Sequence, residues 1–206
     1  MRNLREYISD LNKWNGQNQG ATCRLIRAVE GYGGSVPYRS GVRRQGGVHR
    51  GQSMIRVVVV DARGERIVVQ SYSRTVDGLN VLNGWFKRLP VDVDAGTLGA
   101  AVREALDRTG DRHPRADREQ RQAMLQALQS EMGVRSYSTY LKGARSVTVT
   151  VADPGTVITV TPMVNGGTSG PTKGFTFNVE AEVTIPNAAT DEELGRAVTQ
   201  AFAVAT

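Results

Sequence analysis

The fold is decided by the stretch Met54-Ile55-Arg56-Val57-Val58-Val59-Val60, which is followed by Asp61-Ala62-Arg63-Gly64 and then by Ile67-Val68-Val69. β-Branched residues favour strands, and a short glycine-containing segment between two such runs is typical of a β-hairpin. We therefore expect two antiparallel strands joined by a turn at Asp61–Gly64. The amino-acid composition changes abruptly at Met54, because the residues before it are rich in glycine and arginine.

The same pattern returns 90 residues further along the chain. Val147–Val151 predicts a strand, Asp153-Pro154-Gly155 a turn, and Val157–Val160 a partner strand that ends at Pro162. Aromatic segments after each hairpin are also 90 residues apart, and two helical motifs of the form Leu-Gly-x-Ala-Val are 96 apart. An insertion of six residues in the second copy explains the difference. These pairs are Trp85 and Phe175, and Leu98-Gly99 and Leu194-Gly195.

Helices are expected after each copy and between them. Apolar residues at helical spacing predict one helix over about Thr97–Asp107, a middle helix that stops at Gly133, and a last helix that starts at Thr190 with a capping box to Glu193. The fold class is therefore α+β, with two related hairpin, strand and helix halves that form an antiparallel sheet packed by helices. The halves are residues 54–110 and 146–206, the helical segment between them is 111–145, and Gly-rich residues 1–53 form a separate basic extension that is expected to be poorly ordered.

Charge is distributed unevenly along the chain. The whole protein has a formal net charge of +6, and residues 1–53 alone hold nine basic and three acidic residues, so the remainder is neutral. A basic segment of this kind leaves open a function as a small nucleic-acid-binding protein. Residues 146–206 hold two basic and six acidic residues. Five of these acidic residues are candidates for an acidic contact surface, namely Glu180, Glu182, Asp191, Glu192 and Glu193.

The residue inventory is poor in catalytic and metal-binding groups. The single cysteine, Cys23, cannot form an intramolecular disulfide, and neither His49 nor His113 lies in a cluster with metal-ligand spacing. We expect no catalytic site, no metal and no cofactor. A further hypothesis, beside nucleic-acid binding, is an enzyme whose site is assembled from scattered residues such as His113 and Asp117. The sequence begins without an apolar signal segment, and a cytoplasmic location is expected.

Residues 54–205 resemble the CdiI family of contact-dependent growth inhibition immunity proteins. The resemblance rests on the order of several segments and on the duplicated helical ending, because no single motif is specific. The segments are Leu89-Pro90-Val91-Asp92-Val93, Leu98-Gly99-x-Ala101-Val102, Gly133-Val134-x-Ser136-Tyr137-x-x-Tyr140-x-Lys142, Ile158-Thr159-Val160-Thr161-Pro162, Lys173-Gly174-Phe175 and Asp191-Glu192-Glu193-Leu194-Gly195-x-Ala197.

The resemblance implies a non-catalytic, cytosolic protein that binds the C-terminal toxin domain delivered by a neighbouring cell and blocks its active site. An inhibitor of this kind needs a preformed complementary surface and steering charge. If the toxin is a nuclease with a basic groove, the five acids named above are the expected contacts. The resemblance does not cover residues 1–53. They are either an artificial extension, from a misplaced gene start or from cloning, or a genuine basic segment that binds the toxin or nucleic acid.

Overall fold

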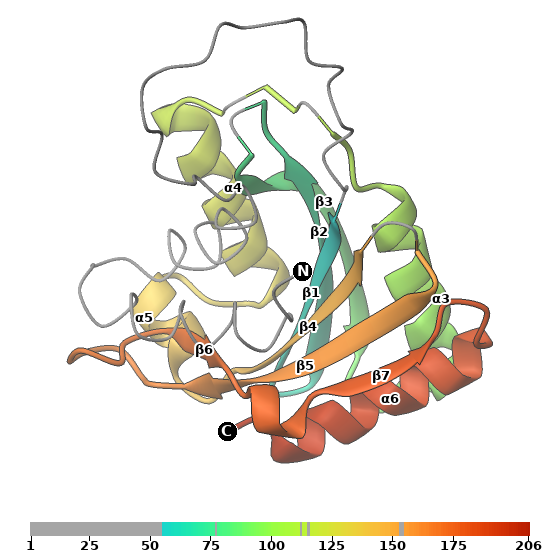
Figure 1. The fold of residues 1–206 in the computed structure, drawn as a ribbon. Coiled ribbons are helices and arrows are strands. Elements are labelled where there is room, and N and C mark those ends of the chain that lie inside the picture. The colour runs from blue at the N-terminus through green and yellow to red at the C-terminus, as the bar shows by residue number, and fades with distance from the viewer. Residues whose placement is uncertain (1–54, 77, 112, 115, 153–154) are drawn as a thin grey trace, which may run out of the picture.

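The structure is a computed structural model that describes residues 55–206 except 77, 112, 115 and 153–154. Along the described chain, a group of strands is followed by a group of helices, then by a second group of strands and a last helix (Figure 1). They are β1 (Ile55–Arg63), β2 (Arg66–Arg74), β3 (Asn80–Pro90), α3 (Ala95–Asp107), α4 (Arg118–Glu131), α5 (Tyr137–Leu141), β4 (Arg145–Ala152), β5 (Val157–Asn165), β6 (Phe175–Phe177), the 3-10 helix η2 (Val179–Ala181), β7 (Val183–Pro186) and α6 (Asp191–Val204).

The strands form one antiparallel sheet in the order β3-β2-β1-β4-β5-β6, and β7 also pairs with β5. The predicted α+β class is confirmed. The two hairpins meet through β1 and β4, so the centre of the sheet joins the two halves of the described chain. The expected turn at Asp61–Gly64 is wrong in position. Arg63 pairs with Arg66, which leaves Gly64 and Glu65 as the turn and places Asp61 and Ala62 inside β1.

The third strand differs between the halves. In the first half, β3 pairs with β2 along most of its length, with a bulge at Gln70/Tyr72 where Gly84 takes a φ of 87°. A positive φ is readily adopted by glycine, and a bulge tolerates it. In the second half, η2 interrupts the corresponding stretch, so β6 and β7 pair with different parts of β5. β3 ends at Pro90, so only the first two residues of the segment Leu89–Val93 belong to a strand.

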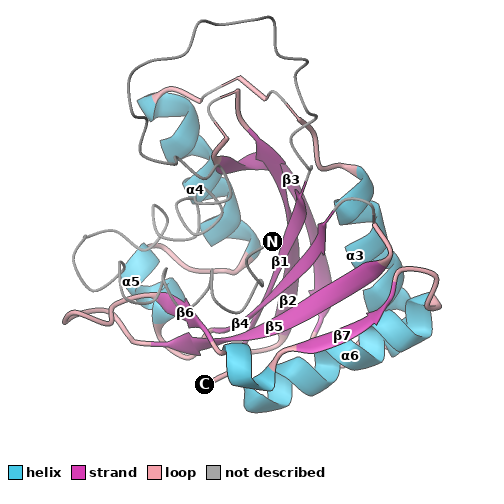
Figure 2. Ribbon diagram, viewed as in Figure 1, coloured by secondary structure: helices cyan, strands magenta, loops and turns pink. Residues whose placement is uncertain are grey.

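Helices cover both faces of the sheet. α3 and α6 lie side by side on one face, and α4 and α5 lie on the other (Figures 1 and 2). The α3/α6 face holds the main hydrophobic core, in which the predicted inward residues of both helices are buried. These residues are Leu98, Ala101, Val102, Ala105 and Leu106 of α3, and Leu194, Ala197, Val198, Ala201 and Phe202 of α6.

The two Leu-Gly motifs have a reciprocal role in the contact between α3 and α6. A Cβ atom on Gly99 would overlap the backbone carbonyl of Asp191, and a Cβ atom on Gly195 would overlap the backbone carbonyl of Ala95. Each glycine therefore lets the first turn of the other helix approach its backbone closely. The close approach explains why glycine follows leucine in both motifs.

The opposite face of the sheet is more polar. Asp61, Gln70, Ser146 and Thr148 are buried there, beneath a second hydrophobic cluster that α4 and α5 contribute to. α4 starts at a capping box between Asp117 and Gln120 and ends before Gly133, whose φ of 67° confirms the predicted helix stop. On this face the strands supply buried hydroxyl, amide and carboxyl groups beside apolar residues such as Val59 and Val68.

Candidate functional site

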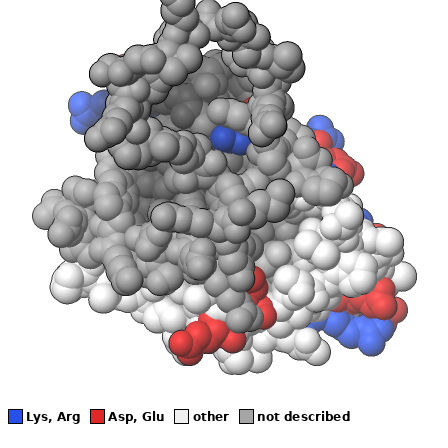
Figure 3. Space-filling view, in the orientation of Figure 1, with Lys and Arg blue, Asp and Glu red and all other residues white. Residues whose placement is uncertain are grey.

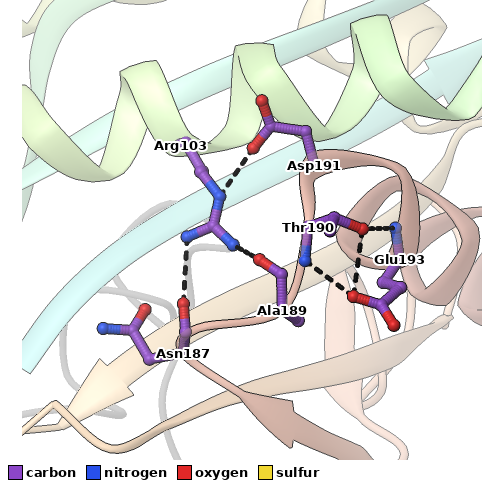
Figure 4. A network of polar contacts seen from close by, with 6 residues as sticks. All are labelled: Arg103, Asn187, Ala189, Thr190, Asp191 and Glu193. Carbon is purple, nitrogen blue, oxygen red and sulfur yellow. Dashed lines mark hydrogen bonds and ion pairs between the residues drawn. The ribbon is translucent and has the colours of Figure 1, made fainter.

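Asp191, the first of the candidate acids in α6, is bound to α3. The Nε atom of Arg103 lies 2.6 Å from Asp191 Oδ1, and the same guanidinium donates to the backbone carbonyls of Asn187 and Ala189 (Figure 4). A guanidinium that holds a carboxylate and two carbonyls fixes the loop before α6 to α3. Asp191 therefore has a structural partner within the described chain.

The two other acids of this helix start also have partners. Glu193 accepts hydrogen bonds from the backbone N–H and the hydroxyl of Thr190 at 2.7 and 3.0 Å, which confirms the predicted capping box (Figure 4). These hydrogen bonds, first from the backbone and then from the side chain of Thr190, lower the pKa of Glu193. Glu192 lies 2.6 Å from Arg196 on the exposed side of α6.

Glu180 and Glu182 lie in and after η2, at the other end of β7. Glu180 is exposed, and Glu182 is half-buried and accepts a hydrogen bond from the hydroxyl of Thr161 at 3.0 Å. The four residues of β7 and the loop after it separate this pair from Asp191. The five candidate acids thus form two groups, one at η2 and one at the start of α6.

The visible surface agrees with this separation. In Figure 3 the acidic side chains form separate areas, and some of these areas adjoin basic side chains. Surface pairs such as Glu192 with Arg196 contribute little to stability and leave both charges in contact with water. Glu180 and Glu192 are therefore the members of the two groups whose carboxylates are most available to a partner.

A second candidate site lies beneath α4 and α5, where the carboxyl group of Asp61 is 1% exposed. Tyr140 of α5 donates to Asp61 Oδ2 at 2.5 Å, and the amide of Gln70 donates to the same oxygen. The remaining oxygen, Oδ1, has no hydrogen-bond partner among the described residues, and neither does the hydroxyl of Ser146, which lies opposite Asp61 on β4.

Burial changes the acidity of this cluster. Desolvation raises the pKa of Asp61 to about 6, although the nearby side chains of Ser146, Tyr140 and Gln70 act to lower it. Burial also raises the pKa of Tyr72 and Tyr140, and the charge of Asp61 adds to this effect. The tyrosines therefore stay protonated, and Asp61 is mostly a carboxylate at neutral pH.

A small cavity of ≈ 30 Å³ is lined by Asp61 and Ser146, the residues that carry the two unpartnered atoms. Asp61, Gln70 and Ser146 line its buried side, while the half-buried Leu125 of α4 and Tyr137 of α5 line its outer side. A volume of this size holds about one or two water-sized groups. The cavity thus lies between a residue with a buried carboxylate and half-buried side chains of α4 and α5.

Sequence reasoning did not find this cluster. It assigned Asp61 to a turn, since aspartate is common in turns, and it gave Tyr140 no role at Asp61 because the two residues are 79 positions apart. The alternation of side chains between the two faces of a strand did hold a signal for the position of Asp61. Val57, Val59 and Asp61 share one face of β1, so a strand that continued to Arg63 would have placed Asp61 beneath the covering helices.

The remaining predictions concern catalytic and membrane features. Within the described ranges, no group of three His, Cys, Asp or Glu residues is arranged to hold a metal, and no helix is long and apolar enough to cross a membrane. His113 pairs through its backbone with the end of β2, and Asp117 caps α4. Cys23, His49 and the basic segment 1–53 lie outside the described residues.

Comparison with known proteins adds a family and a fold. The family model CdiI, described as CDI immunity protein, matches residues 56–205. A solved protein of unknown function from Neisseria meningitidis is similar with 16% identity and a TM-score of 0.61, over 77% of this chain and 100% of that chain. The CdiA-CT/CdiI toxin and immunity complex from Yersinia pseudotuberculosis is similar with 16% identity and a TM-score of 0.60, over 75% and 100%. No curated protein sequence matches the chain.

Proposed function

The chain belongs to the CDI immunity protein family, whose model matches residues 56–205, and from this premise we propose that it binds a cognate toxin C-terminal domain in the cytosol and neutralises it by covering the active site. The family match is the observation that carries the proposal. The similarity of the fold to a chain of a solved toxin and immunity complex supports it.

The physical design of the described domain suits an inhibitor that works by binding. Its sheet is covered by helices on both faces, and its main core contains residues from both halves of the domain. A rigid surface loses little conformational entropy on association, so more of the contact energy appears as affinity. Such a scaffold needs no reaction centre to block a toxin.

We propose that the acidic groups at η2 and at the start of α6 contribute to toxin recognition. Opposite charges on two partners speed their encounter, and the effect weakens as salt is added. Asp191 and Glu193 also hold the start of α6 in place. A test of charge must therefore spare them and alter Glu180 and Glu192, which are exposed.

The experiment measures association between this chain and its cognate toxin C-terminal domain, which is sought in the product of the gene immediately upstream. The wild-type chain is expected to form a stable complex and to inhibit the toxin in a stoichiometric manner. The double variant E180K/E192K is expected to associate about tenfold more slowly at low salt, with the difference shrinking at high salt. Stopped-flow fluorescence or biolayer interferometry gives both rates.

A second charge reversal supplies the control. E65K/E119K changes the net charge by the same amount at two exposed positions outside the candidate surface. It is expected to associate at nearly the wild-type rate. Equal slowing by both double variants would show a general effect of net charge and contradict a role for the acidic groups, whereas absence of any complex with the wild-type chain would contradict the proposed function itself.

A further inference from the structure

The cavity beneath α4 and α5 has an arrangement suited to a positive group. Asp61 and Ser146 line it from the sheet, both are at most 1% exposed, and the carboxylate oxygen Oδ1 and the hydroxyl oxygen Oγ of these residues meet no hydrogen-bond criterion with a partner among the described residues. Tyr72, Tyr137 and Tyr140 also line the cavity. Carboxylate oxygens and aromatic faces both attract ammonium groups, and the attraction is stronger where water is excluded.

The carboxylate lacks a positive partner of its own. No Lys, Arg or His side chain among the described residues forms an ion pair with Asp61, and the side chains that lower its pKa, those of Ser146, Tyr140 and Gln70, are all neutral. A buried charge with only neutral partners destabilises a folded protein. A bound cation would compensate the negative charge of Asp61 and would also donate a hydrogen bond to Oδ1.

We infer that this pocket, built from Asp61, Ser146 and the three tyrosines, receives the ammonium group of one lysine side chain of the partner toxin. The inference rests on the proposed function for the identity of the partner. Apolar residues on the outer side of the cavity, including Leu125 and Leu128 of α4, would contact the methylene groups of the lysine. Tyr137 and Leu125 are the two lining residues that are half-buried, while the others are buried, so a ligand would enter past these two side chains.

The size of the cavity selects among cations. An ammonium group occupies about the volume of one water molecule, which a cavity of ≈ 30 Å³ accommodates. A guanidinium group is larger and planar, and its donors suit a carboxylate that offers both oxygens. Asp61 offers only Oδ1, because Oδ2 already accepts from Tyr140 and Gln70. Lysine therefore fits this pocket better than arginine.

The first experiment probes the pocket without any toxin. The ¹⁵N-labelled full chain is titrated at about pH 7.5, above the pKa of Asp61, with butylammonium, butanol and butylguanidinium in parallel. Butylammonium is expected to bind saturably in the millimolar range, at least about tenfold more tightly than the other two. The amide signals of Asp61, Tyr140 and Ser146 should shift together. No saturable binding, or equal binding of butanol or butylguanidinium, would overturn the inference.

Variants link the binding to the carboxylate. D61N preserves the shape of the side chain and removes its charge, and it is expected to weaken butylammonium binding at least about tenfold. D92N removes the same charge from an exposed loop and is expected to bind like the wild-type chain. Equal affinity of D61N and the wild type would overturn the assignment to Asp61. The comparison of butylammonium with butanol needs no variant, so a folding defect in D61N would leave the test intact.

The second experiment uses the toxin domain encoded upstream. D61N is expected to bind it at least about tenfold more weakly than the wild type and D92N do. If the wild type binds and D61N binds equally well, the lysine pocket is wrong and the proposed function stands. If the wild type does not bind the toxin, the proposed function fails, and the toxin is not the source of the lysine. The butylammonium titration still decides whether the pocket binds an ammonium group.

Discussion

Asp61 is a carboxylate whose burial costs stability. Its pKa of about 6 in the folded protein lies above the value of 3.8 for a solvated aspartate, because burial disfavours the charged form. The folded state therefore binds a proton more readily than the unfolded state between these two values. The stability that this proton provides is fully present below pH 3.8 and is lost as the pH rises through about 6.

The first prediction concerns D61N and pH. The substitution should raise the free energy of unfolding at pH 7 by up to about 3 kcal/mol, because a shift of roughly two pKa units no longer opposes folding. The asparagine carbonyl can accept from Tyr140 and Gln70, while its amide can donate to Ser146. Urea unfolding at pH 4, 5, 6 and 7 measures this difference between the variant and the wild type.

The control is the change with pH in the difference between the unfolding free energies of D61N and the wild type. The pKa values of Asp94, Glu104 and Glu193 are lowered by hydrogen bonds, so these acids add stability with rising pH, but they are present in both proteins. The gain from D61N should therefore shrink toward pH 4. A gain that is equal at pH 4 and pH 7, or a loss of stability at pH 7, would contradict the destabilising role of the buried Asp61 charge.

The second prediction concerns the hydroxyl of Tyr140. Y140F removes the hydrogen bond to Asp61 Oδ2 and leaves the carboxylate with one donor fewer. We expect a loss of about 1–3 kcal/mol at pH 7 and a further rise in the pKa of Asp61. Y137F changes a half-buried neighbouring ring and serves as the matched variant. NMR titration of the Asp61 carboxyl carbon reads the pKa directly, and an unchanged value in Y140F would argue against the bond.

At the level of elements, the contact between α3 and α6 depends on the two glycines that lie against each other's helix start. Gly99 and Gly195 occupy the second position of the two repeated Leu-Gly motifs. Both would place a Cβ atom on backbone that cannot move aside alone. The packing of the helices is therefore set by these two positions, in addition to the apolar residues that follow them.

The third prediction is that G99A and G195A each lower the free energy of unfolding by at least about 2 kcal/mol, since the helices must separate to admit the methyl group. G96A, in the first turn of α3, meets only the side chain of Asp94 at 3.3 Å. It should stay within about 1 kcal/mol of the wild type, because alanine also favours helix. Thermal and urea unfolding measure the free energy of unfolding of G99A, G195A and G96A. Equal losses in all three variants would contradict the close contact between α3 and α6.

Over the whole molecule, local patterns predicted the elements well and the assembled polar cluster poorly. The inward faces of α3 and α6 were predicted because apolar residues recur at helical spacing, and the start of α6 because Thr190 and Glu193 form a capping box. The split of the third strand by η2 carries no such local signal. The cavity at Asp61 depends on β1, β2, β3, β4, α4 and α5 meeting at one point, which no single segment encodes.

The fourth prediction concerns residues 1–53. The family match covers residues 56–205, so the family domain lies after this segment. A chain that starts at Met54 is therefore expected to fold with a similar unfolding midpoint and to neutralise the toxin. Failure to fold or to protect would show that the basic segment is required. Salt-dependent nucleic-acid binding that disappears on this deletion would instead favour the alternative function.

The most direct test of immunity function is protection of cells. The cognate toxin domain is expressed from an inducible promoter with the wild-type chain, with an empty vector, or with an immunity protein from an unrelated toxin system. Only the wild-type chain is expected to restore growth, and the toxin is expected to co-purify with it as a stoichiometric complex. Growth arrest that persists in the presence of well-expressed, folded wild-type chain would contradict the immunity function.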